Sequence, residues 1–475
     1  MGKMSVNTAV IQKVFLAQRA TSQVWKSQPI ANRVARLKKI QAWIENHRSQ
    51  IQEALYLDSG KPAEEVDLSE IYVVLSEIKH ALKNLEHWAK PKKVSSNVPL
   101  IGSKSYIHYE PKGVCLIISP WNFPFNLSVG PLVSALAAGN TAILKPSELS
   151  THCSAMVSEM VSELFDSDEV AVFNGDKQVA TQLLDQPFDH IFFTGSPAVG
   201  KIIMQSAASH LTSITLELGG KSPAIIDANA DLTDAAEKLA WGKFLNCGQT
   251  CIAPDYLLVH ESIEEELTDL LCQCIDKFFD PDWDGIENSE SYARIIGESH
   301  FERLEWLLND AINAGAKIEY GGFTDKQSKY FSPTLLSGVP AKTGVLEKEI
   351  FGPILPILTY SEPQQAIELI NSMPKPLAMY IFSEEKNFQK MVLNHTSAGS
   401  AAINDCVVQF MNPYLPFGGV GESGFGRSHG HHGFLAFSNQ KSVLVQKTGL
   451  TSVKPLFPPY DQFTKKAIDM LLKYL

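Results

Sequence analysis

The sequence lacks the cysteine spacing of a metal site or of a disulfide scaffold. It has seven cysteines, an odd number, and no two of them form a C-x-x-C pair. We therefore expect reduced thiols, the usual state in the cytoplasm, and no bound metal. His429, His431 and His432 share one loop, but no cysteine or carboxylate lies at a spacing that would complete a metal site.

Long apolar runs and an excess of positive charge are also absent. No stretch approaches the roughly 18–20 uninterrupted apolar residues of a membrane-spanning helix. Residues 1–10 have no apolar core, so we expect no signal peptide. The net charge of −11 makes a nucleic acid or an anionic membrane an unexpected main partner. These absences predict a cytoplasmic protein.

The 475 residues have an ordinary globular composition, with 44% hydrophobic and 20% charged residues, which is enough for several domains. Apolar residues at helical spacing predict helices from Val34 to Leu55 and from Leu75 to Leu85. Residues 91–113 contain prolines, glycines and an alternating stretch, and they predict a β-hairpin or arm.

From residue 114 onwards, strands and helices alternate. The predicted buried strands are Val114–Ile118, Thr141–Lys145, Val170–Phe173 and His190–Phe193. This alternation is typical of a parallel sheet with helices on its faces, so the fold class is α/β. A second α/β stretch begins with a strand at Ala224–Asp227 and runs to about residue 410.

Near the C-terminus, the sequence predicts a strand at Ser442–Gln446 and a final helix after Pro459. This helix is amphipathic, because its apolar residues recur on one face: Phe463, Ala467, Leu471 and Tyr474. We expect that face to pack on the protein, and contact with a partner or a membrane surface is the alternative.

The segment Asp189–Gly200 predicts a strand that runs into a helix. Ser196 suits the N-cap and Pro197 the first helical position. Backbone N–H groups at such a helix start can bind a pyrophosphate. The spacing from Gly195 to Gly200 does not match G-x-G-x-x-G, so an ordinary turn between strand and helix stays open on this evidence.

Three further residues could carry covalent catalysis. Cys251 could be a nucleophile if its surroundings lower the thiol pKa, and a buried apolar cysteine is the alternative. Glu217 lies in an apolar, strand-like run, where burial would raise its pKa and suit a general base. An edge-strand glutamate facing solvent is the alternative. Asn122 follows the strand Val114–Ile118 and could donate to an oxyanion.

Taken together, seven motifs over residues 10–450 resemble the NAD(P)-dependent aldehyde dehydrogenase superfamily. In order they are Pro120–Pro124, Leu144–Glu148, Phe193–Ser196 with Gly200, Leu216–Lys221, Gly248–Cys251, Glu349–Pro353 and Pro416–Gly419. The short N-terminus, the segment Asn246–Tyr256 and the Ser428-His-Gly loop are similar to the class 3 branch, which includes fatty aldehyde dehydrogenases.

The resemblance implies the division of the chain. A Rossmann-like NAD(P)-binding domain would comprise residues 1–90 and 114–220, and an α/β catalytic domain residues 221–410. Residues 91–113 and 411–450 would form a small β arm for bridging and oligomerisation. Residues 451–475 would form a C-terminal amphipathic helix.

The resemblance also implies the roles of individual residues. Cys251 would be the nucleophile, Glu217 the base for the hydrolytic water, and Asn122 a donor to the oxyanion, whereas Cys247 would be non-catalytic. The cofactor would be NAD, with NADP possible. The residues implied for its binding are Lys145 and Glu148 at the adenosine ribose, Ser196 near the pyrophosphate, Glu349 and Phe351 at the nicotinamide ribose, and also Trp121, Gly195, Gly200 and Leu218.

The implied reaction is the oxidation of an aldehyde to its acid through a thiohemiacetal and a thioester. A medium- or long-chain aliphatic or an aromatic substrate is expected, and the class implies a homodimer. One alternative is a dehydrogenase for aromatic, coniferyl-type aldehydes, and another is a silent relative with a binding role. A thiol hydrolase would need a histidine in a defined catalytic motif, and the sequence offers none.

Overall fold

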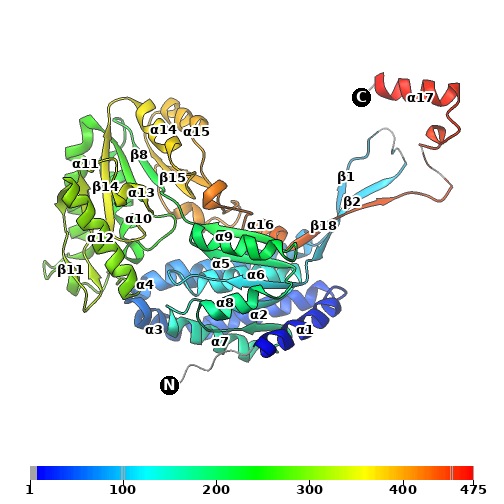
Figure 1. Cartoon of the computed structure of the whole chain (residues 1–475), viewed down its shortest axis with the longest axis horizontal. Coiled ribbons are helices and arrows are strands. Elements are labelled where there is room, and N and C mark those ends of the chain that lie inside the picture. Colours follow the sequence, from blue (N-terminus) through cyan, green and yellow to red (C-terminus); the bar gives the residue numbers. More distant parts are fainter. Residues whose placement is uncertain (1–7, 98–99, 101, 450, 452, 474–475) are drawn as a thin grey trace.

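A computed structural model describes residues 8–97, 100, 102–449, 451 and 453–473. Two large sheets with their helices form the body, and a third, small sheet extends from it as an arm (Figure 1). Among these residues, no helix has the length and apolar character needed to cross a membrane.

The first large sheet has six strands in the order β17-β7-β6-β3-β4-β5. Its strands are β3 (Val114–Ile118), β4 (Thr141–Lys145), β5 (Val170–Val172), β6 (His190–Gly195), β7 (Ser213–Leu218) and β17 (Gly424–Phe425). All pairs are parallel except β17 with β7. The strand order reverses beside β3, between β3 and β6, which is where open α/β sheets bind ligands.

Helices cover both faces of this sheet, which is why β3 and β4 are buried along their whole length. One face packs against α2 (Ile30–Asn46), α3 (Arg48–Ser59), α5 (Tyr72–Trp88), α6 (Asn126–Ala138) and α7 (Thr151–Leu164). The other face packs against α1 (Thr8–Trp25), α8 (Lys177–Leu184) and α9 (Pro197–Ala208). Between α3 and α5 the chain forms α4 (Ala63–Val66) and the π-helical turn η1 (Asp67–Ile71).

The second large sheet has seven strands in the order β10-β13-β14-β9-β8-β15-β16. They are β8 (Pro223–Ile226), β9 (Tyr256–His260), β10 (Lys317–Tyr320), β13 (Thr334–Ser337), β14 (Ile354–Tyr360), β15 (Ala378–Phe382) and β16 (Ser400–Ile403). Its helices are α10 (Leu232–Phe244), α11 (Glu264–Phe279), α12 (Glu298–Ala314), α13 (Gly344–Glu347), α14 (Pro363–Ser372) and α15 (Lys386–His395). Because β8 begins five residues after β7 ends, the chain crosses directly from one sheet to the other.

The predicted hairpin is confirmed as part of the arm. Strands β1 (Lys92–Val94) and β2 (Lys104–Pro111) pair antiparallel, and β18 (Ser438–Val445) pairs along the other side of β2. Residues 411–450, predicted to belong to the arm, are instead divided. Here β17 joins the first sheet and α16 (Gly430–Ala436) packs on α5 and α6, while β18 lies in the arm.

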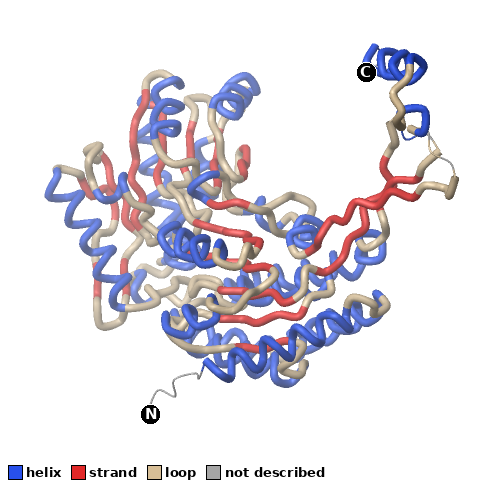
Figure 2. Tube along the Cα trace, turned by 45° about the vertical axis from the view of Figure 1, so that its right-hand side comes forward, coloured by secondary structure: helices blue, strands red, loops and turns tan. Residues whose placement is uncertain are grey.

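The final helix, α17 (Gln462–Lys473), does not pack on the body as the sequence predicted. Its main contacts are with the short helix η8 (Lys454–Leu456), and both views place it beyond the end of the arm (Figures 1 and 2). Phe463, on the predicted apolar face, is 67% exposed, and Met470 and Leu472 are exposed as well. Tyr474 lies outside the described residues.

Candidate active site

A cavity of about 1140 Å³, including its open mouth, holds Cys251 and Glu217 in its wall. Leu218, Thr250 and Ser428 line the cavity beside them. Most of the remaining wall is apolar and comes from both halves of the body: Leu68, Val73, Phe123, Leu127, Trp241 and Phe410. The predicted nucleophile and the predicted base therefore face one space, although they are 34 residues apart.

The turn before Cys251 has an unusual backbone, and the Gln249 side chain is one of the groups that hold it. Asn246 and Cys247 both have φ of 53°, in the left-handed region that non-glycine residues rarely adopt. The Gln249 Nε2 donates to the carbonyls of Asn246 and Arg294, at 3.0 Å each, and its Oε1 accepts from a backbone N–H. This anchoring leaves Cys251 partly exposed in the cavity and Cys247 fully buried.

Cys247 and Cys251 have different surroundings. The Cys247 thiol donates to the Tyr292 hydroxyl at 3.3 Å and does not line the cavity. Burial and the carboxylates of Glu349 and Glu217 raise the pKa of Cys251 to about 12. This is the opposite of the lowered pKa that a thiolate nucleophile needs. In this state the Cys251 thiol is protonated, so its activation requires a base.

Glu217 is buried on a strand that is paired on both sides, so the alternative of a solvent-facing edge glutamate is wrong. Its strand β7 lies between β6 and β17, and its side chain is 5% exposed. Burial raises the pKa of Glu217 to about 8. The Ser428 hydroxyl donates to Oε1 at 3.1 Å, while Oε2 has no hydrogen-bond partner in the part of the chain described. An unpaired, buried oxygen beside a cavity is a natural place for a water molecule.

Asn122 lies against the backbone of the nucleophile loop. It follows β3, and its Nδ2 donates to the Gln249 carbonyl at 3.0 Å. An amide has two N–H groups, and the second has no acceptor among the residues that the structure describes. The side chain is 4% exposed, so this amide is shielded from bulk solvent, and Phe123 and Asn126 of the same loop line the cavity.

The residues predicted for the cofactor form two groups. The first lies where β4 and β6 end, at the edge of the first sheet. The Lys145 ammonium donates to Glu148 at 2.7 Å, and Ser196 caps α9 through the Val199 N–H at 3.4 Å. A Cβ on Gly200 would lie 2.8 Å from Leu218, so glycine allows the start of α9 to pack against β7. Gly195 pairs with Leu218 across the two strands.

The second group lies where the chain crosses between the sheets. The Trp121 and Phe351 rings meet edge to face at 5.3 Å, and Phe351 has φ of 49°. Burial and Asp255 raise the pKa of Glu349 to about 8, and its carboxylate accepts the Gly220 N–H. A Cβ on Gly219 would clash with that carboxylate. The residues present, with a helix N-terminus, a lysine and buried carboxylates, fit a dinucleotide.

The sequence did not identify Ser428 as a partner of Glu217. The two residues are 211 positions apart, and the pairing of Gly424 with Glu217 between β17 and β7 brings them together. Because β17 has only two residues, it has no periodic signal in the sequence. The sequence predicted the Ser428-His-Gly loop only as a motif similar to the class 3 branch.

Comparisons with known proteins show the family of the chain. The model of the aldehyde dehydrogenase family matches residues 4–443. The chain belongs to the aldehyde dehydrogenase family. It is 44% identical to 4,4'-diaponeurosporen-aldehyde dehydrogenase of Staphylococcus aureus over 95% of this chain and 97% of that one. It is 40% identical to aldehyde dehydrogenase family 3 member A2 of Pongo abelii over 97% and 92% of the two chains. The predicted resemblance, including its class 3 branch, is confirmed.

Solved structures confirm the predicted α/β fold of an aldehyde dehydrogenase. The substrate-bound Staphylococcus aureus AldH superposes with a TM-score of 0.93 at 42% identity, covering 99% of this chain and 100% of that one. An aldehyde dehydrogenase from Bacillus cereus in its NAD+ complex has a TM-score of 0.83 at 27% identity, covering 93% and 90%. A Methanocaldococcus jannaschii glyceraldehyde-3-phosphate dehydrogenase complexed with NADP has a TM-score of 0.85 at 26% identity, covering 93% and 95%.

Proposed function

We propose that this aldehyde dehydrogenase oxidises medium- or long-chain aliphatic or aromatic aldehydes to carboxylic acids through a thioester on Cys251. The observation that carries the proposal is the shared cavity, in which Cys251 and Glu217 lie in a largely apolar wall. An apolar wall favours an apolar substrate tail, because burying each CH₂ of the tail stabilises the complex by about 0.8 kcal/mol. Intact Cys251, Glu217 and Asn122 argue against a catalytically silent relative.

The Cys251 sulfur attacks the aldehyde carbon and forms the thiohemiacetal. The thiol proton passes first to water in the cavity, where Cys251 is partly exposed, and Glu349 and Glu217 lie close enough to influence the thiol pKa. The carbonyl oxygen becomes an oxyanion, which accepts from the free N–H of Asn122 and from the Cys251 backbone N–H. Each such donor contributes roughly 3–4 kcal/mol in comparable sites.

The enzyme binds NAD or NADP, whose nicotinamide accepts the hydride when it is bound. The residues that would hold it are Lys145, Glu148, Ser196, Glu349 and Phe351. After the oxidation, the acyl group is a thioester on Cys251. Glu217 then takes a proton from a water at its unpaired Oε2, and the hydroxide releases the acid. Dividing the reaction into two steps is the purpose of the covalent thiol.

The cofactor preference should depend on the Lys145–Glu148 pair. We propose that Glu148 accepts from the ribose 2′-OH of NAD and repels the 2′-phosphate of NADP. In Glu148→Gln, the Lys145 ammonium loses its carboxylate partner and becomes available to that phosphate. Because Glu148 is partly exposed, we expect the ratio of NADP to NAD efficiency to rise about tenfold, less than the unscreened charge interaction would give. An unchanged ratio of kcat/KM values would show that Glu148 does not face the 2′ position.

A series of straight-chain aldehydes tests the proposed substrate class. We expect KM to fall as the chain lengthens, by about threefold to fourfold per CH₂ until the cavity is filled, from the burial energy of each methylene. The measurement is NADH formation with each aldehyde at saturating NAD. An aromatic aldehyde and a short hydrophilic one serve as comparisons. A lowest KM for the short hydrophilic aldehyde would contradict the proposed substrate class.

We further propose a cytoplasmic homodimer in which residues 1–90 and 114–220 bind the cofactor and residues 221–410 carry the nucleophile. The arm and α17 support the dimer, since they extend from the body with apolar side chains exposed. A second subunit would cover these side chains, and a membrane surface would be the alternative for α17. Sedimentation of the whole chain measures its mass, and the mass of a monomer would refute the dimer. Sedimentation together with lipid vesicles tests whether α17 binds a membrane surface instead.

A further inference from the structure

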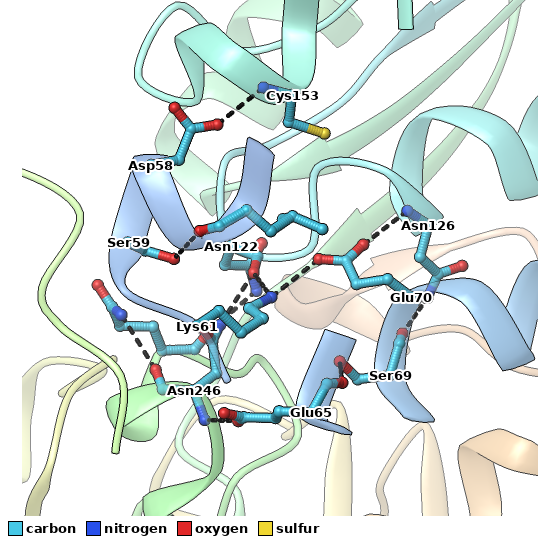
Figure 3. A network of polar contacts seen from close by, with 12 residues as sticks. Asp58, Ser59, Lys61, Glu65, Ser69, Glu70, Asn122, Asn126, Cys153 and Asn246 are labelled. Atoms are coloured by element: carbon cyan, nitrogen blue, oxygen red, sulfur yellow. Dashed lines mark hydrogen bonds and ion pairs between the residues drawn. The ribbon is translucent and has the colours of Figure 1, made fainter. Parts of the chain in front are cut away.

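A buried ion pair lies directly behind the Asn122 loop (Figure 3). We propose that Lys61 and Glu70 are positioning residues that hold Asn122 in place for the oxyanion. The inference rests on the proposed function, because it concerns the donor that the proposed reaction uses. Neither residue belongs to any motif that the sequence analysis identified.

Lys61 fixes the backbone of Asn122. Its side chain is fully buried, and its ammonium donates to Glu70 Oε1 at 2.8 Å and to the Asn122 carbonyl at 2.9 Å. The Asn246 Nδ2 donates to the same carbonyl at 2.9 Å. A carbonyl oxygen has two lone pairs, so both are used. One donor comes from the helical layer and the other from the turn before Cys251.

Glu70 holds the other end of the same loop. Its Oε2 accepts the Asn126 N–H at 2.7 Å, at the start of α6. The loop from Asn122 to Asn126 is therefore held at its first carbonyl by Lys61 and at its last N–H by Glu70. The Lys61 ammonium also lies 4.3 Å from the ring centre of Phe123, which lines the cavity.

The helix α4, which runs directly into the turn η1 that carries Glu70, contacts the nucleophile turn as well. Glu65, five residues earlier, accepts the Asn246 N–H. Glu70 lies in the π-helical turn η1, and such turns occur often at functional sites. One helical segment thus fixes both the Asn122 loop and the turn that leads to Cys251.

Stability alone is a weak reason to bury this pair. Removing two charges from water costs several kcal/mol for each ion, and well-packed apolar residues often serve the fold as well or better. A catalytic donor, in contrast, must be held closely, since a shift of about 1 Å can reduce the rate about a hundredfold. The contacts of Lys61 and Glu70 are with the backbone that carries such a donor.

The test uses the double variant Lys61→Met/Glu70→Gln in the full-length enzyme. Removing both charges avoids an unpaired buried ion, and the glutamine can still accept the Asn126 N–H. The matched control is Lys277→Met/Glu237→Gln, which removes an exposed ion pair of similar length, 2.7 Å, between α10 and α11. Thermal melting of both variants reports on folding.

The rates of aldehyde oxidation and of Cys251 alkylation together distinguish a misplaced Asn122 from general damage to the active site. Aldehyde oxidation develops an oxyanion, whereas alkylation of Cys251 by iodoacetamide is a displacement at carbon that develops none. We expect kcat for oxidation to fall about 10- to 100-fold in the double variant, the scale of a misplaced donor. Alkylation should stay within about twofold of wild type, because the pair removed has no net charge. The control should match wild type in both rates.

A mutant cycle with Asn122→Ala completes the test. If the pair acts through Asn122, adding Lys61→Met/Glu70→Gln to Asn122→Ala should lower kcat by less than about threefold more, since coupled residues are not additive. The inference is overturned by wild-type kcat in the double variant, by an equal loss in oxidation and alkylation, or by full additivity with Asn122→Ala. A wild-type enzyme that forms no NADH from any aldehyde would instead refute the proposed function.

Discussion

Replacing Cys251 by alanine should abolish aldehyde-dependent NADH formation. We expect a fall in kcat of at least about a thousandfold, comparable to the loss of a nucleophile in other covalent enzymes. Binding of NAD should be unchanged, because the residues proposed to hold it lie at the edge of the first sheet and at the crossing. The measurements are NADH absorbance during turnover and a calorimetric titration with NAD.

The matched control is Cys247→Ala, four positions away. Cys247 is fully buried, its thiol faces Tyr292, and it does not line the cavity. This variant should keep most of the activity. An inactive Cys247→Ala together with an active Cys251→Ala would reverse the assignment of the nucleophile.

The Glu217→Gln enzyme should make one equivalent of NADH and then nearly stop. Hydride leaves before water is needed, so the first turnover survives as a burst. Steady-state turnover should fall about 10²- to 10⁴-fold, the usual effect of removing a general base. Rapid mixing with NAD and aldehyde measures the burst and the steady state together. Loss of both would mean that Glu217 also activates Cys251 or holds the fold.

The pH profile gives a second test of Glu217. A base must be deprotonated, and burial raises its pKa to about 8. Steady-state turnover of the wild-type enzyme should therefore rise with pH through about 8 where hydrolysis limits the rate. The Ser428 hydroxyl lowers this pKa, so Ser428→Ala should move the rise to higher pH. A rise at the same pH in both enzymes would assign it to another group.

The sequence predicted the features that have local signals. Continuous apolar runs identified the strands β3, β4, β5 and β6, with ends that differ by at most two residues. Family motifs identified the residues that follow these strands. In a parallel sheet the carboxyl ends of the strands lie at one edge, so topology places Asn122, Lys145 and Ser196 at that edge.

Features that depend on distant contacts could not be predicted. The ion pair of Lys61 and Glu70 acts on a loop 61 residues from Lys61, and nothing in its own segment signals that contact. The raised pKa of Cys251 depends first on burial and then on Glu349 and Glu217, which come from other elements. The prediction that α17 packs on the body is wrong. An amphipathic pattern indicates that one face of a helix is apolar, but it does not identify the surface that this face contacts.

Trapping the acyl-enzyme directly tests whether the reaction proceeds through a thioester on Cys251. Glu217→Gln is mixed with NAD and a long-chain aldehyde, quenched in acid, digested and analysed by mass spectrometry. We expect the mass of the acyl group, as a thioester, on the peptide at Cys251 and an unmodified Cys247. An acyl group on any other residue, or a burst of NADH without a covalent adduct, would contradict it.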